Sequence, residues 1–236
     1  MPMSPFKFKP EVDGRGKVFV TGFQGIGGTG YWCVRYLIES LKAKRVSFVD
    51  GDVVPPITNV SSGRIVTPFE LYEKGELVFF RVESTPYGGR DVEFYRRVAE
   101  WVESSGFKEA ALVGGLNINL KFDDSEGRIA YTSAFEPYGE LKKLKFLEDD
   151  HLIAGPVAIM LNYFEVSGFP AYAILAYAHP DRVDPKAAAV SARILSRQYG
   201  FKVDVEPLLK GAEFIEEELK KREEKEKRAY DESFYA

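Results

Sequence analysis

The sequence predicts an α/β fold, a sandwich in which helices cover a mostly buried sheet. Two observations support this prediction. Short apolar runs, typical of buried strands, alternate along the chain with longer segments whose apolar residues have helical spacing. The chain also has no internal repeat, and no linker precedes residue 206. We therefore expect one α/β domain over residues 1–206, followed by a C-terminal helix and charged arm over residues 207–236.

The expected strands are apolar runs rich in Val, Ile, Phe and Ala, with turn-forming or charged residues at most of their ends. The first run stops at Gly22 and the second at Asp50. Pro55-Pro56 then excludes regular structure and fixes an extended loop. Residues 201–205 fit either an edge strand or a loop. The predicted strands are residues 17–21, 45–50, 64–66, 77–82, 110–113, 128–133 and 171–177.

The expected helices have apolar residues three and four positions apart. The clearest start is Asp184-Pro185, because aspartate can accept hydrogen bonds from the free N–H groups of a first turn and proline suits the first helical position. The same helix should stop at Gly200. The predicted helices are residues 31–41, 91–104, 141–147, 155–166 and 184–199, with a last one from residue 207.

Composition excludes several classes of protein. The net charge of −4 and the isoelectric point near 5.5 argue against non-specific binding of nucleic acid. A single cysteine, Cys33, excludes a disulfide framework and a multi-cysteine metal site, and its place in a predicted helix beside Trp32 indicates a buried, unreactive thiol. No run approaches the roughly 18 apolar residues of a membrane span. We expect a soluble, cytoplasmic protein without a membrane partner.

One motif suggests a nucleotide. Gly25, Gly27, Gly28 and Gly30 lie in a G-x-G-x-x-G pattern that follows a predicted strand and opens a helix, and Asp50 ends the next strand. In dinucleotide-binding proteins such glycines let the backbone approach a pyrophosphate, the helix N-terminus supplies N–H donors, and the acid binds a ribose hydroxyl. A nucleotide-dependent enzyme is therefore one hypothesis, to be tested by thermal stabilisation with NAD, FAD, ATP or AMP.

Other features weaken that hypothesis. Asp50 runs into a proline-containing loop where a dinucleotide fold needs a second crossover helix, and the second half offers no evident group for hydride transfer. His151 and His179 lie at loop-like positions outside any metal or triad spacing. We therefore expect no catalytic residues, no cofactor and no metal. The structural alternative is that the glycines permit a tight turn and close packing, with an anion as an occasional occupant.

The end of the sequence suggests a docking segment. Residues 220–228 are all charged and have nothing to bury in a core. Phe234-Tyr235-Ala236 then places two aromatic side chains and a carboxylate where a partner can reach them, unless the aromatics fold back onto the domain. The tripeptide resembles the hydrophobic–tyrosine–any (HbYX) motif, with which proteasome activators and assembly factors insert their C-termini between α-subunits of the 20S proteasome.

The body of the chain carries turn and helix-start residues in a definite order, over most of residues 15–215. Each is moderately specific alone, and their order is more so. In sequence they are a glycine-rich turn at 22–27, a helix through 36–38, Pro55-Pro56, Gly63, Pro68, Gly114-Gly115 at a strand end, Gly155 at a helix start, and Asp184-Pro185 at another.

This order resembles the PAC2 family, the proteasome assembly chaperone family with archaeal members. Gln24 departs from the Gly-Phe-Pro-Gly start that is commoner there. The resemblance implies a three-layer α/β/α sandwich of the phosphorylase/hydrolase-like kind, usually without demonstrated enzymatic activity, and homo-oligomers that bind proteasome subunits. It also implies roles for the tail: Tyr235 would enter the α-subunit interface, Phe234 would fill apolar surface, and the Ala236 carboxylate would pair with a lysine.

The leading hypothesis is thus an ATP-independent proteasome-binding factor, either an assembly chaperone or a gate activator of the 20S core. Several linked tails would bind more tightly than one through effective concentration. A third alternative is a scaffold that assembles with another small protein through its tail.

Overall fold

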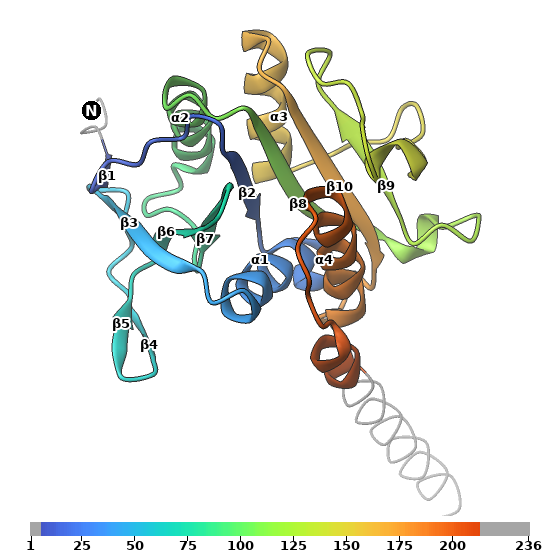
Figure 1. Ribbon diagram of the computed structural model, residues 1–236, viewed down its shortest axis with the longest axis horizontal. Coiled ribbons are helices and arrows are strands. Elements are labelled where there is room, and N and C mark those ends of the chain that lie inside the picture. The colour runs from blue at the N-terminus through green and yellow to red at the C-terminus, as the bar shows by residue number, and fades with distance from the viewer. Residues whose placement is uncertain (1–5, 213–236) are drawn as a thin grey trace, which may run out of the picture.

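The computed structural model describes residues 6–212, which form an α/β/α sandwich around one large mixed sheet (Figure 1). The sheet has eight strands in the order β1-β3-β6-β7-β2-β8-β10-β9. A separate hairpin of β4 (Asn59–Ser61) and β5 (Arg64–Val66) projects from it. The sheet strands are β1 (Lys7–Lys9), β2 (Val18–Gly22), β3 (Lys44–Asp50), β6 (Phe69–Lys74), β7 (Leu77–Val82), β8 (Glu109–Asn117), β9 (Gly127–Tyr131) and β10 (Ala171–Ala178).

The middle of the sheet is parallel and its flanks are antiparallel. Strands β7, β2, β8 and β10 run parallel to one another. On one side β9 pairs antiparallel with β10, and on the other β6, β3 and β1 continue the sheet as antiparallel neighbours. The carboxyl ends of the four parallel strands therefore lie together along one edge of the sheet.

Two pairs of helices form the outer layers, which confirms the predicted three-layer fold. Helices α1 (Thr29–Ser40) and α4 (Pro185–Tyr199) pack together on one face. Helices α2 (Asp91–Ser104) and α3 (Pro156–Ser167) pack together on the other. Each pair encloses its own apolar core against the sheet.

The central strands read as continuous apolar runs because both faces of the sheet are covered. Every residue of β2, β7 and β10 is buried. Successive side chains alternate between the two cores: Val18 and Val20 join the core beneath α1 and α4, whereas Phe19 joins the core beneath α2 and α3. The sequence therefore shows no polar–apolar alternation there.

Capping residues set the ends of α4. The Asp184 carboxylate accepts a hydrogen bond from the Ala187 N–H at 3.1 Å, Pro185 occupies the first helical position, and Gly200 ends the helix with a φ of 71°. Helix α2 has the predicted bounds of 91–104. The predicted strand at 77–82 is also confirmed without change.

Some elements differ from the prediction. Strand β6 was not predicted because its sequence contains charged residues. One of them, Glu70, is fully buried. Its carboxylate accepts hydrogen bonds from the Arg45 guanidinium at 3.0 Å and from the Thr67 backbone N–H at 2.8 Å. The predicted helix at 141–147 is wrong, since only a 3-10 turn, Leu141–Lys143, forms before Phe146 pairs beside Ile129 of β9. Residues 201–205 form a loop, and residues 206–212 are helical as far as the described chain extends.

Candidate functional site

The glycine-rich turn lies where β2 ends and α1 begins, as predicted. Residues Ile26–Gly28 form a 3-10 turn, and Gly27 and Gly28 have φ values of 63° and 61°. This left-handed region strongly favours glycine over residues with a Cβ. The turn is therefore strained for other residues whether or not a ligand binds.

Close packing also restricts two glycines of the motif, Gly27 and Gly30. A Cβ on Gly30 would lie 2.2 Å from the Val113 carbonyl oxygen of β8, and one on Gly27 would lie 2.7 Å from the Ala178 Cβ. Gly25 differs, because a Cβ there would meet nothing within 4 Å. The turn thus needs glycine at Gly27 and Gly28 for the backbone conformation, and at Gly30 so that α1 can approach the sheet.

The N–H groups at the start of α1 are largely used by the protein itself. Gly28 donates to the Gly25 carbonyl at 2.8 Å, and Tyr31 donates to the Phe23 carbonyl at 3.1 Å. The Thr29 N–H donates to the Ile26 carbonyl. A pyrophosphate would have to compete with these bonds, so the geometry does not favour the dinucleotide site that the motif suggested.

Asp50 is not brought to the turn. Strand β3 is separated from β2 by β6 and β7, which corresponds to about 14 Å at the usual strand spacing. The Asp50 carboxylate instead accepts a hydrogen bond from the Lys9 ammonium at 2.6 Å, and this contact lowers the pKa of Asp50. In a dinucleotide fold the two strands would be neighbours. The acid therefore lacks the position that ribose binding requires.

A large cavity lies beside the turn, at the carboxyl ends of β2 and β8. These strands are neighbours, but their connections leave in opposite directions: β2 leads through α1 to β3 on one side, and β8 leads to β9 and β10 on the other. Crevices at such reversal points are the usual ligand sites of α/β sheets. The cavity has a volume of about 810 Å³.

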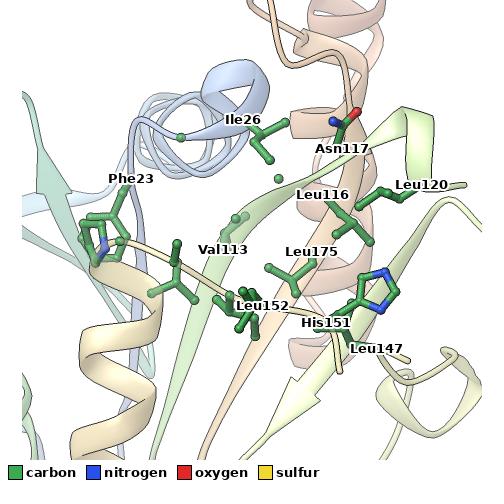
Figure 2. A pocket seen from close by; sticks show the side chains of 18 of the residues that line it. Phe23, Ile26, Val113, Leu116, Asn117, Leu120, Leu147, His151, Leu152 and Leu175 are labelled. Carbon is green, nitrogen blue, oxygen red and sulfur yellow. The ribbon is translucent and has the colours of Figure 1, made fainter. Parts of the chain in front are cut away.

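Four segments form the cavity (Figure 2). Residues 23–26 of the turn form one wall, and residues 113–117 of β8 with Leu175 of β10 form the floor. Leu120, Leu147 and residues 149–157 close the rest. Figure 2 shows Phe23 on one side and His151 with Leu147 on the opposite side. The lining is mainly apolar. Its polar side chains are Gln24, Asn117, Asp149, Asp150 and His151.

A buried arginine holds the outer wall. Arg128 of β9 is fully buried and donates to Glu148 at 2.7 Å and to Asp123 at 2.9 Å. Its guanidinium also packs over the rings of Phe122 and Tyr177. Glu148 lies between Leu147 and Asp149, which both line the cavity, so this cluster fixes the position of that wall.

The remaining candidate side chains show no catalytic arrangement. Cys33 is buried, and burial raises the pKa of its thiol well above the ordinary value. His151 Nδ1 is 4.0 Å from Glu148 Oε2, and the backbone N–H of His179 donates to the carboxylate of Asp184, the cap of α4. Within residues 6–212 there is no group of three or more His, Cys, Asp or Glu side chains that could hold a metal. Within that range, too, no helix is long and apolar enough to cross a bilayer.

The predicted docking residues Phe234, Tyr235 and Ala236 lie outside the described part of the chain. The cavity, in contrast, was not predicted. Gly114 and Gly115, where the strand was predicted to end, instead lie within β8, which continues to Asn117. They and Gly155 at the start of α3 all line the cavity, but their meeting depends on the strand order, which local patterns do not reveal.

Solved structures with this fold include two proteins of Pyrococcus furiosus. PbaA, described as an archaeal homologue of a proteasome-assembly chaperone, is 25% identical and superposes with a TM-score of 0.77 over 95% of this chain and 99% of its own. PbaB, described as an archaeal proteasome activator, is 20% identical, with a TM-score of 0.73 over 94% of this chain and 100% of its own. At that identity the second match establishes the fold alone.

Sequence comparison gives the family. The MJ0106 protein of Methanocaldococcus jannaschii is 23% identical over 226 residues, which cover 91% of this chain and 89% of that protein. The sequence profile of the PAC2 family matches residues 19–223, from the first buried strand to beyond the described residues. Because that match spans most of the chain, the protein belongs to the PAC2 family.

Proposed function

We propose that this protein is a proteasome-binding factor that docks on the α-subunits of the 20S proteasome through Phe234, Tyr235 and Ala236, without ATP. The observation that carries the proposal is membership of the PAC2 family together with a C-terminal sequence of the hydrophobic–tyrosine–any type. PbaA, which matches over nearly its whole length, is described as a homologue of a proteasome-assembly chaperone. PbaB, an activator, has the same fold, so the fold is compatible with both roles.

A strongly charged stretch of sequence separates the docking tripeptide from the folded body. The described part of the chain ends with the helical residues 206–212, and in the sequence residues 220–228 are all charged. A segment with this composition gains nothing from packing on an apolar core. It suits a spacer between the body and a docking tripeptide.

We also propose that the protein acts as a homo-oligomer. A single tripeptide buries little surface, whereas linked copies gain about 10²–10⁴-fold in overall affinity when their spacing fits the target. Helix α3 supplies a plausible contact surface, because its sequence is apolar nearly all round although it lies on the outside of the sandwich. Val166 of α3 is 89% exposed and Val92 of α2 is 66% exposed, and both line a groove of about 320 Å³ between the two helices.

The proposed role is non-catalytic and cytoplasmic. It needs no reaction centre; within residues 6–212 no three His, Cys, Asp or Glu side chains lie together as metal ligands would, and Cys33 is buried with a raised thiol pKa. The internal hydrogen bonds of the glycine turn and the distant position of Asp50 weigh against a nucleotide-dependent enzyme.

The test is hydrolysis of a fluorogenic peptide by a matched 20S proteasome without ATP. The full chain is compared with a version lacking residues 234–236 and with Tyr235→Ala. Binding of each protein to immobilised 20S particles and to free α-subunits is measured in parallel. We expect both changes to abolish binding, while the circular dichroism spectrum and the oligomeric mass stay unchanged.

Stimulation by the full chain alone would identify an activator, and tail-dependent binding to free α-subunits without stimulation would identify an assembly factor. Tyr230→Ala, in the same segment but outside the tripeptide, is the matched control and should bind normally. If the truncated protein binds as well as the full chain, docking through the tail is wrong.

A further inference from the structure

The cavity between the glycine turn and α3 has the features of a ligand site that the proteasome role does not use. We propose that it binds a small molecule with an apolar body and a protonated amine. The proposal is independent of docking through the tail. It rests on the cavity's size and lining, and on the unpaired carboxylates at its mouth.

The floor and walls fit an apolar body. Val113, Leu116 and Leu175 form the floor, and Phe23 and Ile26 close one side (Figure 2). The volume of about 810 Å³ is within the range of pockets that enclose small organic ligands. A ligand that removes this apolar surface from water gains binding free energy.

The charge of the cavity lining indicates which polar group the ligand carries. Apart from His151, the titratable side chains that line the cavity in the described chain are the carboxylates of Asp149 and Asp150. Neither carboxylate has a hydrogen bond or ion pair within residues 6–212, whereas the preceding Glu148 is bound to Arg128. The protein thus neutralises one acid of the segment and leaves two at the cavity. A protonated amine is the ligand group that such carboxylates attract.

The N-terminus of α3 has the opposite charge to the two carboxylates and disfavours a cationic group, but its effect is weaker. Gly155 and Pro156 also line the cavity, and a helix N-terminus carries a partial positive charge of about one half. The two negative charges of Asp149 and Asp150 are larger than this partial positive charge. The same helix start, with the Asn117 and Gln24 amides, can accommodate neutral polar groups of the ligand.

In the experiment the full chain is titrated with matched probes. Calorimetry measures the affinity of each probe, and NMR shows whether the cavity residues are perturbed. The probes are 2-phenylethylamine, tryptamine and octylamine, each with the alcohol and the carboxylate of the same body. Because Asp149 and Asp150 are exposed and ion pairs with exposed carboxylates contribute little, we expect the amines to bind about two- to fivefold more tightly than their alcohols, and the carboxylate probes not to bind. Binding of the amines should weaken as salt screens the carboxylates.

Two variants test the site itself. Asp149→Asn combined with Asp150→Asn should remove the preference for the amine and leave the alcohols unaffected. Ala154→Trp, at an exposed lining position, should block all probes without disturbing the core. The control is Asp124→Asn, an exposed acid outside the cavity lining, which should bind the amines like the wild type.

The proposal is overturned if no amine binds, if amine and alcohol bind equally, or if the double variant keeps the preference. A further overturning result concerns the rim, where Leu152 is 95% exposed and Leu120 is 47% exposed. If hydrogen exchange shows these residues protected in the free oligomer, the cavity is covered by another copy and is not a ligand site.

Discussion

Arg128 of β9 donates from its Nε to Glu148 Oε1 at 2.7 Å, and so fastens a strand at the edge of the sheet to the loop that forms one wall of the cavity. The arginine side chain has no exposed surface, whereas Glu148 keeps 29% of its own. Asp123 and Lys145 complete the cluster, with Lys145 bound to Asp123 at 2.8 Å. A buried cation with two acidic partners is costly to disturb from either side.

Replacing Arg128 with leucine should lower the free energy of unfolding by about 2 kcal/mol. Loss of one partner of a buried pair commonly costs about 3–5 kcal/mol, and the smaller value is expected here because both acids reach solvent. Urea denaturation measures the change. Arg64→Leu, at an exposed position of the β4–β5 hairpin, is the control and should stay within about 0.5 kcal/mol of the wild type. Equal stability of the two variants would show that the cluster contributes nothing.

Stability should fall at acid pH through the same cluster. Hydrogen bonds from Lys145 and Ser125 hold the pKa of Asp123 well below its usual range, and the Arg128 guanidinium lowers the pKa of Glu148. Since both folded values lie below the unfolded values near 4, this stabilisation is complete above about pH 5 and is lost as the pH falls through the folded values. Melting temperatures of the wild type and of Asp123→Asn with Glu148→Gln, measured between pH 7 and pH 2.5, test this. The double variant should show the shallower acid decline, and parallel curves would contradict the assignment.

Two glycines of the same motif should lose very different amounts of stability when replaced by alanine. Gly30→Ala places a Cβ 2.2 Å from a backbone oxygen of β8 that cannot move aside, so we expect a loss of at least about 3 kcal/mol or failure to fold. Gly25→Ala meets open space and should cost less than about 1 kcal/mol. Thermal unfolding distinguishes them. Similar losses in both would show that the turn is not governed by packing.

Val166→Glu should reduce the oligomeric mass in solution if copies meet at the groove between α2 and α3. A charge at this 89% exposed position does not disturb the fold, but it makes burial in an interface unfavourable. Light scattering after size exclusion measures the mass. Val60→Glu is the same substitution at another exposed valine, on the β4–β5 hairpin, and serves as the matched control. An unchanged mass for Val166→Glu would place the contact elsewhere.

Local chemistry explains how far the sequence predicted the fold. Asp184-Pro185 and Gly200 bound α4 because capping depends on a few adjacent residues. The β6 strand was missed because its buried Glu70 finds Arg45, which lies 25 residues earlier in the chain and on another strand. A polar residue with a distant partner cannot be distinguished from an exposed one by local pattern.

The cavity illustrates the same limit. Its glycines were visible as turn residues, but the site also needs Leu175 of β10, Leu120 and the segment around His151, which come together only through the strand order. The glycine motif shows the converse. Its spacing matched a nucleotide site, yet the strand order puts Asp50 beyond β6 and β7.

The pairing of β2 with β8 has a consequence for how the chain folds. Val18 lies beside Glu109, a separation of 91 residues (109 − 18), whereas β6 and β7 are joined by a tight turn. During synthesis one edge of β2 stays without its neighbour until Glu109–Asn117 have emerged. The strands before residue 83 can pair first, but the centre of the sheet has to wait for the second half. Such long-range contacts slow folding, so refolding of the whole chain should be slower than that of a helical protein of equal length.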